Sequence, residues 1–462
     1  MLAKIDGSIF FTCTEVAKRC AVSRQTIWRW RQSGTIPVGR TSRKRTLVFT
    51  ASELELIRAH ASQSDGTRDP WGGVIYLDNS ASARPLPIVR SAVARAMEME
   101  FGNPSSAHGS GRRARQALAA AREQVAALAG ADSSSVTFSS GGTEANNLIL
   151  QGAVASGFRR IITTAVEHPS ILETAEWLRS RGTIVDILAV AADGRISLGD
   201  LLGLPIDANT LVSIQWANNE TGVLQPIMEA AAIVRDRGGT FHTDAAQAIG
   251  KHAIDFARSP IDAMTVTAHK IHGPQGVGAL LLKPTVRPSP LLHGGSQERG
   301  LRVGTENYPG IIGFGVAAEH RLATLQDFVR HTSALRDTFE THLRDSLAGI
   351  SINGLSAARV CTTGNATIAS IDGQALIAQL DKRGVCMSQS SACANMRPEA
   401  SHVLRAMGLT EGQAYASFRY AVSEDTTLEA CQRAARILAE IAIGLGARSA
   451  DPPAQHQRKG VN

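Results

Sequence analysis

Several short apolar runs in the middle of the chain each end in a polar residue and are followed by a helical pattern. Such runs lead to Thr143, His168, Asn219 and Asp244, and a further run ends shortly before Lys270. Strands that alternate with helices favour a mostly parallel sheet covered by helices, with the carboxyl ends of its strands along one edge. The sequence therefore predicts an α/β fold with a functional site at that edge.

Lys270 stands between the apolar run 261–267 and a turn rich in Gly and Pro. A lysine in this position is poorly placed to be a solvated surface charge. A Schiff base with an aldehyde needs an amine whose pKa is lowered by burial and neighbouring cations. Pyridoxal phosphate (PLP) needs such a lysine, an acid at its pyridine nitrogen and a phosphate cradle. Alone, a lysine at the edge of a glycine turn is the simpler interpretation, so the other parts must also be present.

Those parts can be found at the other strand ends. The turn that contains Gly142 and Thr143 opens a helix, whose free backbone N–H groups and threonine hydroxyl suit a phosphate. The flat ring of His168 can stack on a pyridine, and the carboxylate of Asp244, three residues before Gln247, can keep the pyridine nitrogen protonated. Each residue alone is more often a satisfied polar group at a strand end. In this order before Lys270, they favour a PLP enzyme.

The excess of positive charge is confined to the start of the chain. Residues 1–68 carry 12 Lys and Arg against 5 Asp and Glu, and the rest of the chain has 36 of each sign. This imbalance indicates an attached nucleic-acid-binding module. No apolar run approaches the roughly 18 residues of a membrane span, and the start lacks a signal-peptide pattern. The six cysteines form no CxxC pair, so we expect a cytoplasmic protein with no membrane partner and no metal.

Two short helices are predicted within residues 11–34. Thr12 and Glu15 form a capping box for the first helix, while Ser23 can cap the second and Gly34 would end it. The pattern resembles the winged helix-turn-helix of the MerR/excisionase type. The side chains then available to DNA bases and phosphates are Arg24, Gln25, Trp28, Arg29, Arg43, Lys44 and Arg45. A small protein-interaction domain with a solvated basic face is the alternative.

The rest of the chain contains, in this order, YLDNSA, GNPSSAH, SSGGTEANN, EHPSI, NNETG, HTDAAQ, AHKIHGPQG, HGGSQERGLRVGTEN and SSAC. This string resembles the cysteine desulfurases of the NifS/IscS family, which are PLP enzymes. The resemblance implies PLP-dependent fold type I, like that of aspartate aminotransferase, and a homodimer. It also implies L-cysteine as substrate and a sulfur-acceptor protein as partner.

We expect five parts along the chain from these patterns. The expected parts are a helix-turn-helix domain (1–60), a linker (61–70), a PLP-binding large domain with a mostly parallel sheet (71–326), a small α/β domain with a cysteine loop (327–446) and a disordered tail (447–462). The first residues of the large domain are expected to contribute to the small one.

The resemblance also implies a role for each motif residue. Lys270 would hold PLP and move protons at the substrate Cα, His168 would stack on the ring, Asp244 would pair with the pyridine nitrogen, and Gln247 would contact the phenolic oxygen. The phosphate would be bound by Gly142, Thr143, Thr267, His269 and, supplied by the partner subunit, Thr305. The substrate carboxylate would be held by Asn219, which also lies against the cofactor, and by the fork of Arg419.

Cys393 matches the sulfur-accepting cysteine of the family. Its thiolate would attack the substrate sulfur and carry a persulfide on a Ser/Ala-rich loop to Fe–S cluster assembly, tRNA or DNA thiolation. The alternative is a small buried residue. The family usually has a glycine in this loop, whereas this chain has the run Ser388-Gln-Ser-Ser-Ala-Cys393. This departure predicts a stiffer loop or a different acceptor.

Two other functions stay open. A transcription regulator whose PLP domain senses a ligand would bind DNA and PLP without turnover. A selenocysteine lyase would turn over selenocysteine without using Cys393. The intact Cys393 motif favours a desulfurase that is tethered to DNA or regulated by it.

Overall fold

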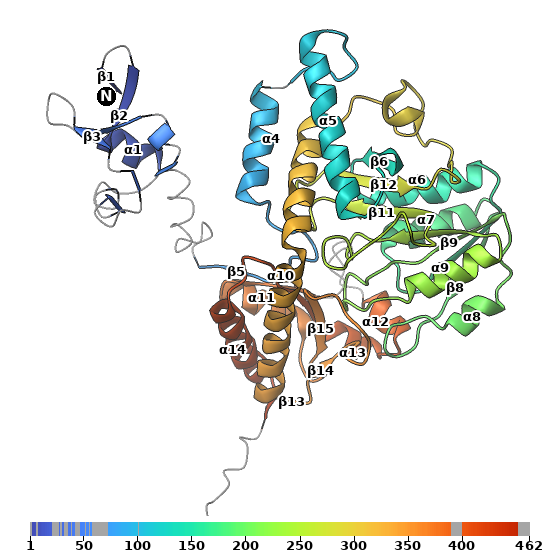
Figure 1. Cartoon of the computed structure of the whole chain (residues 1–462). Helices are drawn as coiled ribbons and strands as arrows, with labels where there is room; N and C mark the ends of the chain where they lie inside the picture. Colours follow the sequence, from blue (N-terminus) through green and yellow to red (C-terminus); the bar gives the residue numbers. More distant parts are fainter. Residues whose placement is uncertain are drawn as a thin grey trace, which may run out of the picture. The chain divides into compact units, whose positions relative to one another are not determined.

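The computed structural model describes residues 2–5, 8–20, 27, 30–31, 36–37, 39–41, 47–50, 52–54, 56–57, 73–99, 101–389 and 400–450. The chain forms two compact units, Met1–Val74 and Ile75–Asn462 (Figure 1). Some predictions fall outside the described ranges: those for Ser23, Arg24, Gln25, Trp28, Arg29, Gly34, Arg43, Lys44, Arg45, Cys393, the linker 61–70 and the tail from 451.

The first unit contains helix α1 (Cys13–Arg19) and a small antiparallel sheet. Thr12 is the N-cap of α1, and its hydroxyl accepts a hydrogen bond from the Glu15 N–H at 3.3 Å, which is one half of the predicted capping box, while the Glu15 carboxylate pairs with Arg19. The sheet consists, in spatial order, of β1 (Leu2–Ile5), β2 (Ser8–Thr12), β4 (Leu47–Phe49) and β3 (Arg40–Thr41). Its core includes Val16, Ala17, Ile27, Ile36, Phe49, Leu54 and Ile57.

The second unit is built on a seven-stranded sheet with the order β6-β12-β11-β10-β9-β7-β8. β7 to β11 pair in parallel, and β12 runs antiparallel to β11 and β6. The strands are β6 (Val136–Ser139), β7 (Arg160–Thr164), β8 (Ile184–Leu188), β9 (Thr210–Ser213), β10 (Thr240–Asp244), β11 (Ala263–Thr267) and β12 (Gly278–Leu282). The predicted mostly parallel sheet is therefore confirmed.

Helices cover both faces of this sheet, which explains why strands such as β9 and β11 are buried along their whole length. Consecutive strand residues enter opposite cores: Ile161 and Leu280 pack with helices α6 and α7, whereas Ile162 and Leu281 pack in the core that contains α5, α9 and α10. The helices of the two layers, with the short α8 near the sheet edge, are α4 (Pro87–Met99), α5 (Gly109–Leu128), α6 (Gly142–Ala155), α7 (Pro169–Arg179), α8 (Leu198–Gly203), α9 (Ile227–Asp236) and α10 (Tyr308–Ser346).

A second core lies around a four-stranded antiparallel sheet with the order β14-β15-β18-β17. Ile75 and Leu77, at the start of the unit, belong to this core, and β5 (Ile75–Tyr76) pairs in parallel with β16 (Val385–Cys386). The remaining elements here are β13 (Leu347–Ala348), β14 (Ser351–Ile352), β15 (Thr363–Thr367), α11 (Gly373–Lys382), β17 (Ser388–Gln389), α12 (His402–Ala406), α13 (Glu411–Tyr415), β18 (Ser417–Ala421), α14 (Leu428–Gly444) and β19 (Arg448–Ser449).

The 39-residue helix α10 joins the two cores. Phe314 in its first half packs against Phe138 of the large sheet, and Phe339 in its second half packs against Tyr420 of the small sheet (Figure 1). Residue 327, the expected domain boundary, thus lies inside a continuous helix.

Residues 447–450 were expected to belong to a disordered tail, but the structure includes them in the second unit. Ala447 is buried in the second core, and β19 pairs with β13, so residues 447–450 belong to the folded unit. Within the residues that the structure describes, no helix has the length and apolar character that a membrane crossing requires.

Candidate active site

The candidate active site lies where β10 and β11 end and α6 begins. Four predicted phosphate-binding residues, Gly142, Thr143, Thr267 and His269, line one cavity of about 280 Å³. The fold therefore brings together residues that lie up to 127 positions apart in the chain, at the strand ends where the sequence predicts a site.

The first turn of α6 forms one wall of this cavity. Its N-cap is Gly141, so no side chain accepts hydrogen bonds from the first N–H groups of this 14-residue helix. β12 begins against this turn: a Cβ on Gly278 would lie 2.8 Å from the Gly141 Cα, so a glycine is required there. Uncapped N–H groups at the positive end of a helix, next to a cavity, suit an anion such as phosphate.

Asp244 is buried at the end of β10 and held by two donors. Its Oδ2 accepts a hydrogen bond from Asn146 Nδ2 at 2.8 Å, and its Oδ1 accepts one from the Ala246 N–H at 2.9 Å. Asn146 Nδ2 also donates to Ser170 Oγ at 2.9 Å, and that oxygen lies 2.8 Å from His168 Nδ1. A continuous chain of hydrogen bonds thus joins the predicted pyridine partner to the predicted stacking ring.

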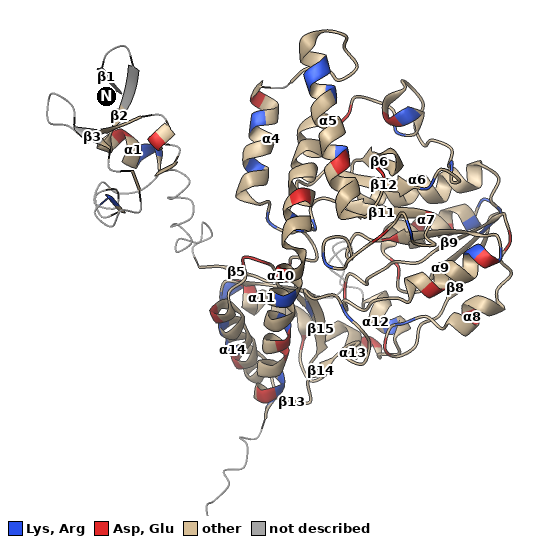
Figure 2. Ribbon diagram, in the orientation of Figure 1, with Lys and Arg blue, Asp and Glu red and all other residues tan. Residues whose placement is uncertain are grey.

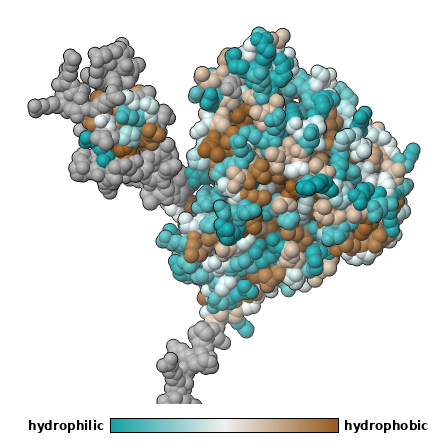
Figure 3. Space-filling view, viewed as in Figure 1, coloured by the Kyte–Doolittle hydropathy of each residue, from teal (hydrophilic) through white to brown (hydrophobic). Residues whose placement is uncertain are grey.

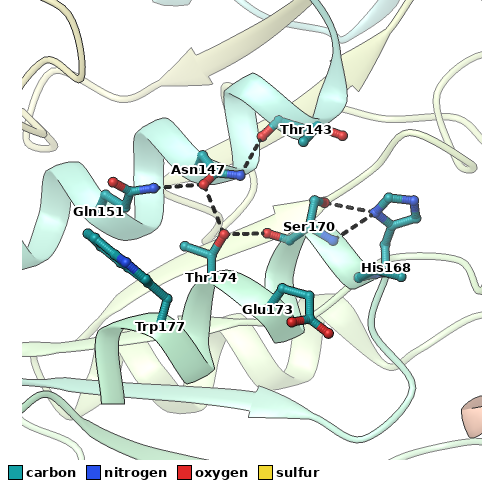
Figure 4. A pocket seen from close by; sticks show the side chains of 9 residues that line it. Thr143, Asn147, Gln151, His168, Ser170, Glu173, Thr174 and Trp177 are labelled. Atoms are coloured by element: carbon teal, nitrogen blue, oxygen red, sulfur yellow. Dashed lines mark hydrogen bonds between the residues drawn. The ribbon is translucent and has the colours of Figure 1, made fainter. Parts of the chain in front are cut away.

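His168 is the N-cap of α7, and its hydrogen bonds fix its tautomer. Nδ1 accepts a hydrogen bond from the Ser170 N–H at 3.1 Å (Figure 4), so in the neutral ring Nε2 carries the proton. Burial lowers the pKa of His168, and the nearby Lys270 and His402 lower it further, whereas Asp244 opposes them. The ring is therefore neutral at neutral pH, as stacking on a cofactor ring requires.

A second cavity, of about 520 Å³, adjoins the first at Thr143. It runs between α6 and α7 from His168 to Trp177, which is 43 % exposed (Figure 4). The labelled side chains between these ends are polar, and Asn147 Oδ1 accepts hydrogen bonds from Gln151 Nε2 and Thr174 Oγ1. This groove opens the site to solvent on the His168 side.

Lys270 lies three residues beyond β11 and is partly buried. His272 shapes its turn. The His272 backbone adopts φ 66°, its Nδ1 donates to the Arg84 carbonyl at 2.7 Å, and its Nε2 accepts from Ser423 Oγ at 2.8 Å. These two bonds hold a left-handed conformation that a residue other than glycine rarely adopts. Burial, followed by the charges of Lys270 and Lys251, lowers the pKa of the neighbouring His269 to about 4.

Arg419 enters from β18 and is almost fully buried. One of its terminal nitrogens lies 2.7 Å from Asp78 Oδ1, and the other donates to the Asn219 carbonyl at 3.2 Å. Its Nε is buried without a hydrogen-bond partner. The two residues predicted to hold the substrate carboxylate therefore meet.

Gln247 is buried one turn beyond Asp244. Its Nε2 donates to the Ser80 carbonyl at 2.9 Å, and its Oε1 accepts from Lys251 Nζ at 2.7 Å. Its contact with a cofactor oxygen stays a prediction.

Thr305 is the predicted phosphate ligand that the partner subunit would supply. Thr305 is exposed and lines neither of the two cavities. Its predicted contact with the phosphate stays a prediction.

Several residues that hold the site together were missed at the level of sequence. Asn146, Ser170, Asp78, His272 and Lys251 were not singled out, although the first four lie within the quoted motifs. Their membership in those motifs was the available signal. Their partners lie in distant segments, so their contacts are visible only in the folded chain.

Comparison with known proteins places this geometry in a family. A family model described as aminotransferase class-V matches residues 75–426, and a helix-turn-helix domain model matches residues 10–57. A cysteine desulfurase of Nostoc sp. is 42 % identical over 378 residues, which cover 81 % of this chain and 94 % of that protein. The chain belongs to the cysteine desulfurases of the aminotransferase class-V family.

Solved structures agree with this membership. A NifS-like protein has a TM-score of 0.75 and 34 % identity, with 80 % of this chain and all of that one covered. SspA, solved in complex with cysteine, has a TM-score of 0.68 and 34 % identity, with 75 % of this chain and 98 % of that one covered. The predictions of fold type I, of a PLP-dependent cysteine desulfurase and of an N-terminal helix-turn-helix are confirmed.

The hydrogen-bond donors and the carboxylate of the site are suited to PLP. The uncapped start of α6 supplies donors for a phosphate, and Asp244 supplies a buried carboxylate, already held by two donors, for a protonated ring nitrogen. Both lie within the same strand-end site as Lys270. Both the arrangement of these residues and the family membership therefore indicate PLP as the cofactor.

Proposed function

We propose that this cysteine desulfurase converts L-cysteine to L-alanine and passes the sulfur through Cys393 to an acceptor. The observation that carries the proposal is the meeting of three parts at one strand-end site. These parts are the hydrogen-bond chain from Asp244 to His168, the turn that bears Lys270, and the pair formed by Arg419 and Asn219. The solved SspA–cysteine complex supports the choice of substrate.

Each part has a defined task in this reaction. When bound, PLP supplies an electron sink that stabilises negative charge at the substrate Cα. Gly142, Thr143, Thr267 and His269 would bind its phosphate, and Asp244 would keep its ring nitrogen protonated. Lys270 would attach it and then move a proton at the substrate Cα. Neutral His168 would cover the ring without adding a charge.

Arg419 would orient the substrate. Asp78 and the Asn219 carbonyl fix its guanidinium in place, and the guanidinium would then bind the substrate carboxylate. By its position in the NNETG motif, Asn219 would lie beside both the substrate and the cofactor.

Cys393 would take the sulfur. Its thiolate attacks the substrate sulfur, an S–S bond forms as the C–S bond breaks, and the electron pair stays with the carbon skeleton. Protonation of that carbon then yields alanine, and the persulfide remains on Cys393.

The test measures alanine and sulfide formed from L-cysteine in the presence of a thiol reductant. Cys393→Ala should lower sulfide formation by at least about 100-fold, because the nucleophile is lost, with cofactor absorbance unchanged. Cys386→Ala is the matched control and should keep the wild-type rate, since burial raises the pKa of that thiol.

Two results would contradict the proposal. Turnover of selenocysteine but not of cysteine, unaffected by Cys393→Ala, would identify a selenocysteine lyase. A wild-type protein that binds PLP and shows no turnover would identify a ligand-sensing regulator.

We extend the proposal to a cytoplasmic homodimer. Thr305 is exposed and outside the cavities of its own chain, as a residue supplied to a second copy would be. Figure 3 shows apolar surface over α4, where Ile88, Met97 and Met99 are exposed, and an apolar face of this kind suits a second copy. Cys361 and Cys431 are buried free thiols, in keeping with a reducing compartment.

The helix-turn-helix supports delivery of sulfur at or near DNA. In the second unit, positions with Lys or Arg are interspersed along the ribbon with positions of Asp or Glu (Figure 2), whereas residues 1–68 carry a net +7. We therefore favour an acceptor associated with DNA over Fe–S cluster assembly or tRNA thiolation.

A further inference from the structure

Lys251 is a buried lysine to which the proposed reaction gives no task. Its exposed fraction is 6 %, and it lies on a helical turn that follows β10. In this turn the Ile249 N–H donates to the Ala245 carbonyl at 2.8 Å, and the Lys251 N–H donates to the Ala248 carbonyl at 2.9 Å. Gln247 and Lys251 therefore lie four residues apart on one side of the turn.

Gly250 makes this position of Lys251 possible. Its φ is +67°, and a Cβ there would lie 2.6 Å from Arg321 Cγ and 2.9 Å from Ile271 Cγ2. The backbone thus passes between α10 and the turn that bears Lys270, through a gap that only glycine fits. As a result, Lys251 enters the site rather than the solvent.

Lys251 and the Ser80 carbonyl together determine which way the Gln247 amide faces. Lys251 Nζ donates to Gln247 Oε1 at 2.7 Å, and Gln247 Nε2 donates to the Ser80 carbonyl at 2.9 Å. An ammonium group can only donate, so it can pair only with the oxygen of the amide. The NH₂ group is therefore held on the opposite side. Without Lys251, one of the two hydrogen bonds that oppose rotation of the amide by half a turn would be lost.

The charges that face Lys251 come from several elements. Lys270 approaches from the turn after β11, Arg321 from α10 and Arg419 from β18, while Cys361 lies before β15. Burial first, and then these cations, lower the pKa of Lys251 to about 7, and the Cys361 thiol opposes the shift. When several cationic groups lie close together in a buried site, each lowers the pKa of the others.

We propose that Lys251 is a positioning residue for the cofactor. It holds the NH₂ group of Gln247 toward the phenolic oxygen of PLP, and its ammonium disfavours a proton on the Lys270 nitrogen. This inference rests on the proposed roles of Gln247 and Lys270.

The test uses the full-length protein loaded with PLP and follows the cofactor's absorbance as a function of pH. Lys251→Met should raise the midpoint of the pH-dependent change by about one unit, because a neighbouring positive charge is lost. Lys251→Arg keeps the charge and should stay near the wild-type midpoint. Lys251→Gln, which also loses the charge, should shift the midpoint like Lys251→Met.

A second readout separates the hydrogen bond from the charge. The rate of PLP loss into a PLP-trapping protein should rise by about tenfold in Lys251→Met and stay near wild type in Lys251→Gln, whose amide can still donate to Gln247. Lys283→Met is the matched control: Lys283 lies at the far end of β12 and donates to the Ser259 carbonyl, so both readouts should remain unchanged.

Unchanged midpoints in both Lys251→Met and Lys251→Gln would overturn the proposal, whatever their thermal stability. If Lys251→Met does not fold, Lys251→Gln, which is close in size, decides the question. Failure of the proposed function would look different, because the pH-dependent absorbance would then persist in Lys270→Ala.

Discussion

Arg419 shows how much of the site depends on single contacts between distant residues. It pairs with Asp78, 341 positions earlier in the chain, at a point where the guanidinium is 5 % exposed. Removal of one partner from a buried ion pair leaves the charge of the other partner buried and uncompensated. Asp78 therefore positions the group that we expect to bind the substrate carboxylate.

At this scale we predict that Asp78→Asn raises KM for L-cysteine by about tenfold, because the guanidinium loses its charged partner and its fixed orientation. The measurement is steady-state alanine formation with circular dichroism as a check of folding. Asp381→Asn, an exposed carboxylate on α11, should behave as wild type. An unchanged KM in Asp78→Asn would separate Asp78 from substrate binding.

The sequence identified residues whose type and local setting already carry their chemistry. Lys270 before a glycine turn and Asp244 at a strand end are of this kind. Asn146 and Ser170 could not be assigned in the same way, because their contacts join three elements that only folding brings together. The assignment of residues 447–450 to a disordered tail was wrong for a similar reason, because the burial of Ala447 depends on a core formed by distant segments.

At the scale of elements, both ends of the segment that carries Cys393 are attached to the substrate side of the site. Before it, β17 pairs with β18, which bears Arg419. After it, Ser401 caps α12, and its hydroxyl donates to Glu220 Oε2 at 2.5 Å, next to Asn219. His402 adds a bond to the Glu167 carbonyl at 2.9 Å. The residues on both sides of the segment that carries Cys393, the proposed sulfur acceptor, are thus attached to the elements that would hold the substrate.

This attachment predicts a dependence of stability on pH. Burial raises the pKa of Glu220 to about 7. Between pH 4.5 and 7 the folded chain keeps a proton that the unfolded chain releases, so this group lowers stability as the pH rises through that window. Glu220→Gln cannot ionise and should remove part of that loss, on the order of 1 kcal/mol per pH unit.

Urea unfolding at pH 5 and pH 7.5 measures this effect. Glu429→Gln, an exposed residue of α14, serves as the control and should leave the difference between the two pH values unchanged. An equal difference in Glu220→Gln and wild type would show that Glu220 releases its proton alike in both states.

At the scale of the whole molecule, the chain joins a helix-turn-helix match at residues 10–57 to an enzyme match at 75–426. The predicted phosphate contacts belong to the basic residues of the first unit. We expect the full-length protein to bind duplex DNA at low salt, with an affinity that falls steeply as salt rises.

Fluorescence anisotropy over a series of salt concentrations tests this expectation. The double variant Arg43→Ala, Arg45→Ala should lower the slope of log Kd against log salt by about 2, since each phosphate contact contributes close to one. Arg330→Ala, an exposed residue of α10, should not change it. Absence of DNA binding by the wild type at low salt would leave the first unit as a protein-interaction domain, with the desulfurase activity unaffected.

The continuous helix α10 also sets the order in which this protein can be made. The partners of Phe314 in the large sheet precede it in the chain, so they have left the ribosome before it does. The small-sheet and α14 residues that pack in the same core as Phe339 come later, up to Ala447. Ile75, at the start of the unit, packs in this core too and can pair with Val385 only after that residue has been made. During synthesis the apolar face of the second half of α10 therefore remains uncovered until the residues of the second core, up to Ala447, have been added. Until then, this apolar face is a surface through which the nascent enzyme can aggregate or bind chaperones.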